Sequence, residues 1–431
     1  MHRFLEVDAC MIRAQRHAHR AELYYTDPAH SGRFTPPMSS APSPRSNLAV
    51  LSRKGADRVR AGHPWIYRSD VTDLQAEPGA VVEVRDGRGA PLGRALSSSE
   101  SQITLRMLTR DATPVDRAFW RGRLAAAIAV RERLAIDATA MRLVHGEADL
   151  LPSLIVDRYD DVLVAQTLSQ GTDAHRDLIV ELLVELLQPR GVLLRNDPKV
   201  RTLEGLPQEV TLAYGEVPPQ VEVREGPVRY LVDPWHGQKT GLFLDQSENH
   251  AVAAGYARGR ALDAFSYHGG FALRMAPHVE HVLALDASAD AVAAIAANAS
   301  RQGLGNVEAR EANVFDALRE FERGDERFDT IVLDPPAFAK HKGAIPKAVS
   351  GYKDINLRAL RLLKPGGHLI TCTCSAHVDE GMFGSIILSA ATDAQIPVVV
   401  VEKRMQARDH PVLLGVPETY YLKCFVLRRA G

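Results

Sequence analysis

From about residue 240, short apolar runs alternate with segments of helical pattern, and this alternation constrains the fold more than any other feature of the sequence. The runs have the length of buried strands. They are 260–265, 281–286, 306–311, 328–333, 367–373, 397–402 and 420–428. Repeated strand–helix units predict an α/β fold with a parallel, doubly wound sheet, which binds its ligand at the carboxyl ends of the strands.

The chain before residue 240 divides into three further parts. Residues 1–46 end in a stretch rich in proline, serine and glycine, which predicts a disordered or extended tail. Short strands and turns over 47–118 predict a small β-rich barrel. Residues 119–225 predict a linker helix and a small α+β unit. Its expected elements are a helix over 118–137, a hairpin of strands 154–157 and 162–165, a helix over 172–188, and strands near 191–195 and 209–214.

Charge is balanced over the whole chain, with 52 Lys and Arg against 53 Asp and Glu. A nucleic-acid binder of this kind needs a local basic patch, because the net charge exerts no long-range attraction on phosphates. The densest basic cluster of the N-terminal half is Arg53, Lys54, Arg58 and Arg60, on a short predicted helix. We expect Arg53, Lys54 and Arg58 to contact RNA phosphates; the alternative is a solvated helix face.

The sequence has 4 cysteines and no CxxC pair, which argues against a disulfide framework and against a zinc site. No metal is predicted. No apolar run is long enough to span a bilayer. These features predict a cytoplasmic protein without a membrane partner.

The first strand–helix turn of the α/β region runs from Asp263 to Phe271 and contains Gly269-Gly270. Glycines here allow close approach of the backbone to a ligand at a helix N-terminus. The turn lacks the GxGxxG pattern, which argues against a dinucleotide. A purely structural turn is the alternative.

The next two strands also end in polar residues. Asp286 could accept both hydroxyls of a ribose, and Asn313 could read an adenine edge with its amide. Capping of the following helix is the alternative role for Asp286. In this order, the three strand ends predict an adenosine-containing cofactor.

Asp334-Pro335-Pro336-Ala337-Phe338 follows the fourth strand. The two prolines stiffen the backbone and fix the carboxylate, which could accept from an exocyclic amino group of a base. Phe338 could stack on that base, or pack in the core. We expect this segment to bind a nucleic-acid base.

The fifth strand ends in Cys372-Thr373-Cys374. A thiolate that adds to C6 of cytosine turns C5 into a nucleophile able to take a methyl group, so a cysteine here suits covalent catalysis. Cys374 lies nearer the strand end and is the expected nucleophile. Cys372 is expected to pack in the core, as free cysteines often do.

These residues resemble a known family: the bacterial large-subunit rRNA methyltransferases that join a PUA domain to a class I methyltransferase domain and form 5-methylcytosine. The resemblance covers about residues 47–430. It rests on Gly62-His63-Pro64-Trp65, Arg142-Leu143-Val144-His145-Gly146-Glu147, Leu154-Ile155-Val156-Asp157-Arg158-Tyr159, Gly237-Gln238-Lys239-Thr240-Gly241, Phe243-Leu244-Asp245-Gln246, Phe265-Ser266-Tyr267 with Gly269-Gly270-Phe271, Asp334-Pro335-Pro336 and Cys374-Ser375.

The resemblance implies a PUA RNA-binding domain over 47–118, a central α+β domain within 119–225 and a Rossmann-like methyltransferase domain over 226–431. It implies S-adenosylmethionine as cofactor, ribosomal RNA of the large subunit or its precursor as partner, and a homodimer. The implied catalytic residues are Cys374 and Asp334, and Pro335 and Phe338 would meet the RNA. The implied cofactor-binding residues are Phe265, Ser266, Tyr267, Gly269, Gly270, Asp286, Asn313 and Asp334.

The sequence departs from the family at several positions. Asn313 stands where the family often has Asp, and an amide still suits adenine. Ala337 and Ala376 stand where a basic residue and Gly are frequent, beside the expected base pocket, so they bear on the target more than on the reaction. Methylation of a purine amino group, which needs no thiol, stays open as an alternative. So does a non-catalytic RNA-binding factor of ribosome assembly.

Overall fold

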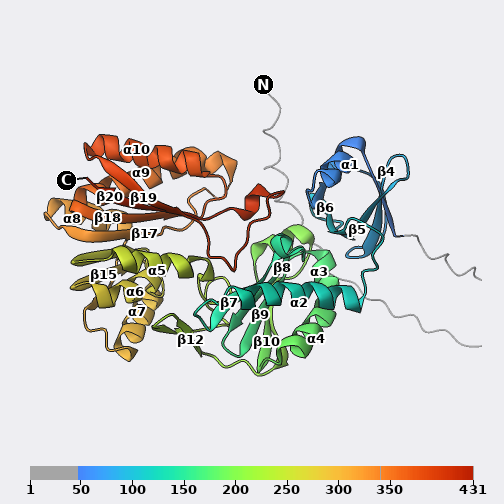
Figure 1. Ribbon diagram of the computed structural model, residues 1–431, viewed down its shortest axis with the longest axis horizontal. Helices are drawn as coiled ribbons and strands as arrows, with labels where there is room; N and C mark the ends of the chain where they lie inside the picture. The colour runs from blue at the N-terminus through green and yellow to red at the C-terminus, as the bar shows by residue number, and fades with distance from the viewer. Residues whose placement is uncertain (1–46, 340, 431) are drawn as a thin grey trace, which may run out of the picture. The chain divides into compact units, whose positions relative to one another are not determined.

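A computed structural model describes residues 47–339 and 341–430 of the chain. The predicted tail over 1–46 lies outside the described residues. Within these described residues, three main sheets follow one another in sequence order (Figure 1). Their order agrees with the sequence-based division into a β-rich part, an α+β part and a doubly wound part.

The first sheet has six strands in the order β2-β6-β5-β4-β1-β3. The strands are β1 Leu48–Leu51, β2 Trp65–Tyr67, β3 Val71–Gln75, β4 Val81–Asp86, β5 Pro91–Ser97 and β6 Ile103–Thr109. Helix α1, Arg53–Arg60, begins where Ser52 accepts a hydrogen bond from the backbone N–H of Gly55. Ala56 and Val59 of α1 are buried in the core of this sheet. The basic side chains of α1 therefore lie on its other faces.

The second sheet has five strands in the order β11-β10-β9-β8-β7. They are β7 Ala140–His145, β8 Leu154–Tyr159, β9 Val162–Thr167, β10 Gly191–Asn196 and β11 Glu209–Gly215. Helix α2, Arg117–Arg133, packs against β7 and buries Trp120 and Leu124. This sheet carries the predicted hairpin as β8 and β9.

The helix predicted over 172–188 is divided in two: α3, Gln170–Ala174, and α4, Arg176–Leu187. In a continuous helix, the carbonyl of Gly171 would accept from the backbone N–H of His175. Instead it lies 2.7 Å from Nδ1 of the His175 ring, and the backbone N–H of His175 donates to Thr172. This local competition explains why a single helix was the wrong prediction.

A hairpin of β12, Val221–Glu225, and β13, Val228–Val232, precedes the third sheet. The two strands of this hairpin lie on either side of the predicted domain boundary at 225/226. The limits of the domains stay predictions. The third sheet has seven strands in the order β16-β15-β14-β17-β18-β20-β19. They are β14 Arg260–Ala264, β15 His281–Asp286, β16 Val307–Glu311, β17 Phe328–Leu333, β18 Leu363–Thr373, β19 Val398–Arg404 and β20 Lys423–Arg429.

The strand–helix pattern predicts a sheet that is parallel throughout. The observed sheet is not, so this prediction was wrong for its last strands. β14 to β18 pair in parallel, whereas β20 is antiparallel to both β18 and β19. The reason is the connection: residues 405–422 join β19 to β20 without an α-helix, so the chain turns back on itself. β20 lies between its two partners inside the sheet.

Helices cover both faces of the third sheet. In Figure 1, α9 and α10 lie together on one side, and α5, α6 and α7 lie on the other. The helices are α5 Ser247–Tyr256, α6 Gly270–Met275, α7 Ala289–Arg301, α8 Val314–Arg323, α9 Ile345–Leu362 and α10 Glu380–Ala394. The core strands are fully buried, including Leu262, Leu283 and Ile331. This packing holds the strand ends at one rigid edge.

Candidate active site

The turn after β14 has an unusual backbone. Phe265, Tyr267 and Gly269 all have positive φ, at 66°, 50° and 86°. Such conformations are costly for residues other than glycine and often mark functional sites. The buried Ser266 hydroxyl donates to Oδ2 of the buried Asp263 at 2.6 Å, which anchors the turn to the protein core. A Cβ at position 269 would lie 3.2 Å from Cγ of Leu273, so this glycine is needed both for its conformation and for space.

Asp286, at the end of β15, faces this turn. Its Oδ2 accepts from the backbone N–H of Tyr267 and its Oδ1 accepts from that of Ser288, each at 2.9 Å. A carboxylate has about four lone-pair sites, so each oxygen can accept once more. The cap of α7 is Ser288, which accepts from Ala291, and not Asp286. The two free sites of Asp286 fit the two hydroxyls of a ribose.

Asn313 follows β16 and caps α8. Its Oδ1 accepts from the backbone N–H groups of Phe315 and Asp316 at 3.0 and 3.4 Å. Its side-chain oxygen is thus committed to the helix, and its exposed amide nitrogen is left to meet a ligand. These groups at three neighbouring strand ends fit an adenosine-containing molecule.

Asp334 lies at the end of β17, where its Oδ1 accepts from Nε2 of Gln246 at 2.8 Å. Burial, together with the nearby Asp245, raises the pKa of Asp334 to about 7. The side chain can therefore carry or release a proton near neutral pH. Gln246 belongs to the Phe243–Gln246 motif, but nothing in that motif assigns it to this carboxylate.

Cys374 follows β18 on the neighbouring strand. Its sulfur lies 4.0 Å from the carbonyl oxygen of Pro335, next to Asp334, and the residue is partly exposed. Burial and the charge of Asp334 raise the pKa of the Cys374 thiol to about 11. Cys372 is fully buried in the core, as predicted. The structure thus brings the two expected catalytic residues to adjacent strand ends.

The segment after Asp334 is packed rather than free. The Phe338 ring lies 4.6 Å from the Tyr352 ring and 5.9 Å from the Phe315 ring, between centroids, and is partly buried. Pro335 is buried and Pro336 exposed. Contact of Phe338 with a base remains a prediction, and its packing leaves only part of the ring available.

The three basic residues predicted to meet RNA differ in their surroundings. Arg53 has 96% of its side chain exposed, and Lys54 is exposed too. Arg58 instead lies 3.2 Å from the buried carboxylate of Asp70 and covers the Tyr67 ring. Arg53 and Lys54 are therefore accessible to a phosphate, although Nε of Arg53 also lies 3.9 Å from the exposed carboxylate of Asp57. Arg58 pairs with a buried acid and so also holds the fold together.

A buried polar cluster joins several motifs that the sequence analysis left without a role. Arg142 forms a bidentate ion pair with Asp157, and Asp157 accepts from Thr240 at 2.6 Å. Asp245 accepts from Lys239 at 2.7 Å and from Tyr421 at 2.8 Å. Burial opposes the charge on Asp245, but Lys239 and His410 outweigh it and lower the pKa. The cluster therefore fixes the segment that leads to Gln246.

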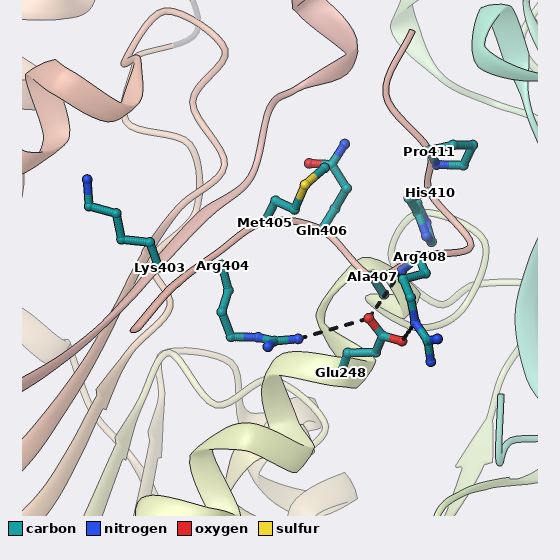
Figure 2. Close-up of a pocket in the computed structure, with 9 residues that line it drawn as sticks. All are labelled: Glu248, Lys403, Arg404, Met405, Gln406, Ala407, Arg408, His410 and Pro411. Atoms are coloured by element: carbon teal, nitrogen blue, oxygen red, sulfur yellow. Dashed lines mark hydrogen bonds and ion pairs between the residues drawn. The ribbon is translucent and has the colours of Figure 1, made fainter. Parts of the chain in front are cut away.

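A cavity of about 460 Å³ lies between Glu248 at the start of α5 and the segment from Lys403 to Pro411 (Figure 2). It is lined by Glu248, Lys403, Arg404, Met405, Gln406, Ala407, Arg408, His410 and Pro411. None of these residues was predicted for the site. In the described part of the chain, no group of three or more His, Cys, Asp or Glu side chains could hold a metal ion. No helix among the described residues is long and apolar enough to cross a membrane.

Comparisons with known proteins agree with this geometry. A family model described as a PUA-like domain matches residues 49–110, and one described as a methyltransferase domain matches residues 257–407. The solved methyltransferase SMU.776, in complex with SAH, has a TM-score of 0.77 at 20% identity and covers 88% of this chain and 99% of its own. A methyltransferase structure from Streptococcus mutans gives 0.76 at 20% identity, with the same coverage. The fold and site thus define an S-adenosylmethionine-dependent methyltransferase with a PUA-like domain.

Curated relatives refine this class. Ribosomal RNA large subunit methyltransferase I of Aliivibrio fischeri (strain MJ11) is 39% identical over 392 residues, covering 88% of this chain and 99% of its own length. The protein of that name from Tolumonas auensis is 40% identical over 395 residues, covering 89% and 99%. The chain belongs to the ribosomal RNA large subunit methyltransferase I family.

Proposed function

We propose that this protein methylates C5 of a cytosine in large-subunit ribosomal RNA, through a covalent bond between Cys374 and C6 of the base. The names of the relatives support large-subunit ribosomal RNA as the substrate. The observation that carries the chemistry is the partly exposed thiol of Cys374 beside Asp334, on the strand next to the expected cofactor site.

The residues present fit S-adenosylmethionine. Asp286 keeps two acceptor sites for the ribose, and Asn313 offers an amide N–H to adenine. When bound, the cofactor supplies an electrophilic methyl carbon on a sulfonium. Asp334 and Cys374 belong to the adjacent strand ends, so a base held there would meet that methyl group.

Cys374 would supply the nucleophile. Its thiolate adds to C6, which forms the S–C6 bond and moves the C5=C6 electron pair onto C5. C5 would then form a bond to the methyl carbon of the sulfonium, whose S–CH3 bond would break to leave a neutral thioether. Loss of the C5 proton to a base restores the double bond and breaks the S–C6 bond, so the thiolate leaves. Because the pKa of the thiol is about 11, its proton must pass to a base as the substrate binds or as addition begins.

Asp334 would hold the base. As a carboxylate it can accept from the exocyclic amino group of cytosine, and as the acid it can donate to the ring nitrogen N3. A pKa of about 7 makes both forms available near neutral pH. A proton given to N3 would offset the negative charge that develops when the thiolate adds.

Outside the methyltransferase region, α1 of the PUA-like domain would contact the RNA through Arg53 and Lys54, which are exposed and point away from the buried core residues. Arg58 would contribute less, because Asp70 already neutralises it. A homodimer and a cytoplasmic location remain expectations from the sequence.

Methylation of a purine amino group is the second candidate. The raised pKa of Cys374 favours it, because a neutral thiol is a poor nucleophile and this reaction needs none. Asp334-Pro335-Pro336 suits either acceptor.

Replacement of Cys374 by Ala separates the two. For C5 methylation, we expect loss of methyl transfer to ribosomal RNA by about 10³-fold or more, with unchanged binding of S-adenosylmethionine in calorimetry. Cys372→Ala is the matched control, since this thiol is buried two positions away. Activity that survives in Cys374→Ala, with a methylated purine in mass mapping of the RNA, would replace this proposal by the second candidate.

A further inference from the structure

A chain of three hydrogen bonds runs from the cavity in Figure 2 to Asp334. Nε of Arg404 donates to Oδ1 of Asn249 at 2.9 Å, Nδ2 of Asn249 donates to Oε1 of Gln246 at 2.7 Å, and Nε2 of Gln246 donates to Oδ1 of Asp334 at 2.8 Å. Asn249 and Gln246 are buried, and Arg404 reaches the cavity. The residues come from β19, α5 and the turn just before α5.

The direction of this chain is fixed by chemistry. A guanidinium has only donors, so the Asn249 atom that faces Arg404 must be the oxygen. The amide nitrogen of Asn249 then faces Gln246, which must present its own oxygen. Rotation of either amide by half a turn would place oxygen against oxygen or nitrogen against nitrogen. Asn249 is held in this orientation a second time, since its Nδ2 also donates to the Met405 carbonyl at 3.2 Å.

We propose that Arg404, Asn249 and Gln246 are positioning residues that keep Oδ1 of Asp334 an acceptor, so that any proton on Asp334 must sit on Oδ2, the oxygen left for the base. This inference rests on the proposed role of Asp334 in base binding. It specifies which oxygen serves the substrate. Without these hydrogen bonds, a proton could reside on either oxygen, and the acid form with the proton on Oδ1 would point it away from the base.

Charges around Asp334 are compatible with this role. Asp245 and Asp263 raise its pKa, whereas His250, whose Nδ1 lies 2.9 Å from Glu225, lowers it. The thiol of Cys374 lies on the adjacent strand. The donor from Gln246 favours the charged form of Asp334. Loss of that donor must therefore raise the pKa of Asp334, and it does so whichever protonation state the reaction uses.

An infrared pH titration of the protein tests the chain without any substrate. The signal is the carbonyl band of a protonated carboxyl group that disappears in Asp334→Asn. In Gln246→Leu we expect the midpoint of this band to move up by about one pH unit, since one hydrogen bond to a charged group accounts for a shift of that size. Gln246→Met keeps a similar volume if the leucine variant folds poorly, and it should raise the midpoint by a similar amount, because a thioether cannot donate to Oδ1.

Arg408→Gln is the matched control. Arg408 lines the same cavity and pairs with Glu248, but it makes no bond to Asn249. It should leave the midpoint unchanged, whereas Arg404→Gln, which can offer Asn249 either group, should raise it by less than Gln246→Leu does. An unchanged midpoint in both Gln246 variants, or an equal rise in Arg408→Gln, would contradict the proposed role of the hydrogen bonds between Arg404 and Asp334.

The pH profile of methyl transfer gives the second readout. The inflection assigned to Asp334 should move up in Gln246→Leu in step with the infrared midpoint. If the wild type transfers no methyl group to RNA while the infrared shifts appear, the proposed function is wrong and the proposed hydrogen-bond path is supported. If methyl transfer is normal in the wild type and the midpoint does not move in the variants, the chain fails alone.

Discussion

The two halves of the site are built differently. At the ends of β14, β15 and β16, Asp286 and Asn313 bind backbone N–H groups of residues at most 19 positions away. At the ends of β17 and β18, Asp334 takes its hydrogen bond from a side chain 88 positions earlier, and burial raises the pKa of both Asp334 and Cys374. The cofactor half is thus organised by local backbone, and the base half by distant side chains and by a low dielectric.

The base half should be the more sensitive to loss of one charge. In Asp334→Asn, we expect methyl transfer to fall by about 10²- to 10³-fold, because the amide can neither carry the proton nor accept at both oxygens. Calorimetry should find the affinity for S-adenosylmethionine changed by far less than the rate. A larger loss of cofactor affinity than of rate would show that Asp334 serves the cofactor half instead.

The thiol of Cys374 should react slowly at neutral pH. A pKa of about 11 leaves about 100-fold less thiolate than an ordinary cysteine thiol of pKa 9.0 would have. Alkylation by iodoacetamide, followed by mass spectrometry of the Cys374 peptide, should therefore keep rising by about tenfold per unit from pH 7 to 10. A plateau reached near pH 8 would contradict the burial effect, and Cys374→Ala identifies the labelled site.

The cofactor half should lose affinity rather than rate. Asp286→Ala removes two charge-assisted hydrogen bonds to the ribose and leaves the Tyr267 N–H without its acceptor. We expect the Kd for S-adenosylmethionine to rise by about 10- to 100-fold, with little change of kcat at saturation. Asp290→Ala, an exposed acid in the first turn of α7, is the control. Equal effects of the two substitutions would remove Asp286 from the ribose site.

The smallest effect is expected outside both halves. Arg53→Gln and Lys54→Gln should each reduce the salt dependence of RNA binding by about 0.7 in the slope of log K against log salt. Filter binding of an rRNA fragment at several salt concentrations measures it. Lys199→Gln, an exposed cation of the second sheet's region, should leave the slope unchanged. An unchanged slope in the Arg53 and Lys54 variants would place the RNA elsewhere.

Much of the fold was predictable because the apolar runs are short and well separated. The runs 281–286 and 328–333 coincide with β15 and β17, and the basic helix after Ser52 is α1. The residues predicted for the cofactor half were selected for a related reason, since they follow strand ends directly and interact locally. The PUA-like domain is confirmed by its family model. S-adenosylmethionine as cofactor is confirmed by the methyltransferase family model together with the solved methyltransferases.

The rest depends on contacts between distant parts of the chain. The reversed direction of β20 depends on how residues 405–422 return to the sheet, which strand periodicity does not encode. Gln246 was visible in a motif, but nothing local linked it to Asp334. Asp263, buried inside an apolar strand with its pKa raised to about 6, could have been noticed as an acid in a core run. The roles of the individual site residues remain predictions.

The interior place of β20 has a consequence for synthesis. Among the described strands, β19 pairs only with β20. Until residues 423–429 have left the ribosome, the outer edge of β18 and the whole of β19 lack partners. The nascent chain then exposes Val399, Val400 and Val401 next to an unpaired sheet edge. These valines are more than 40% exposed even in the folded protein. This sheet can form completely only after β20 has been translated, and a nascent chain stalled before that point would be prone to aggregate.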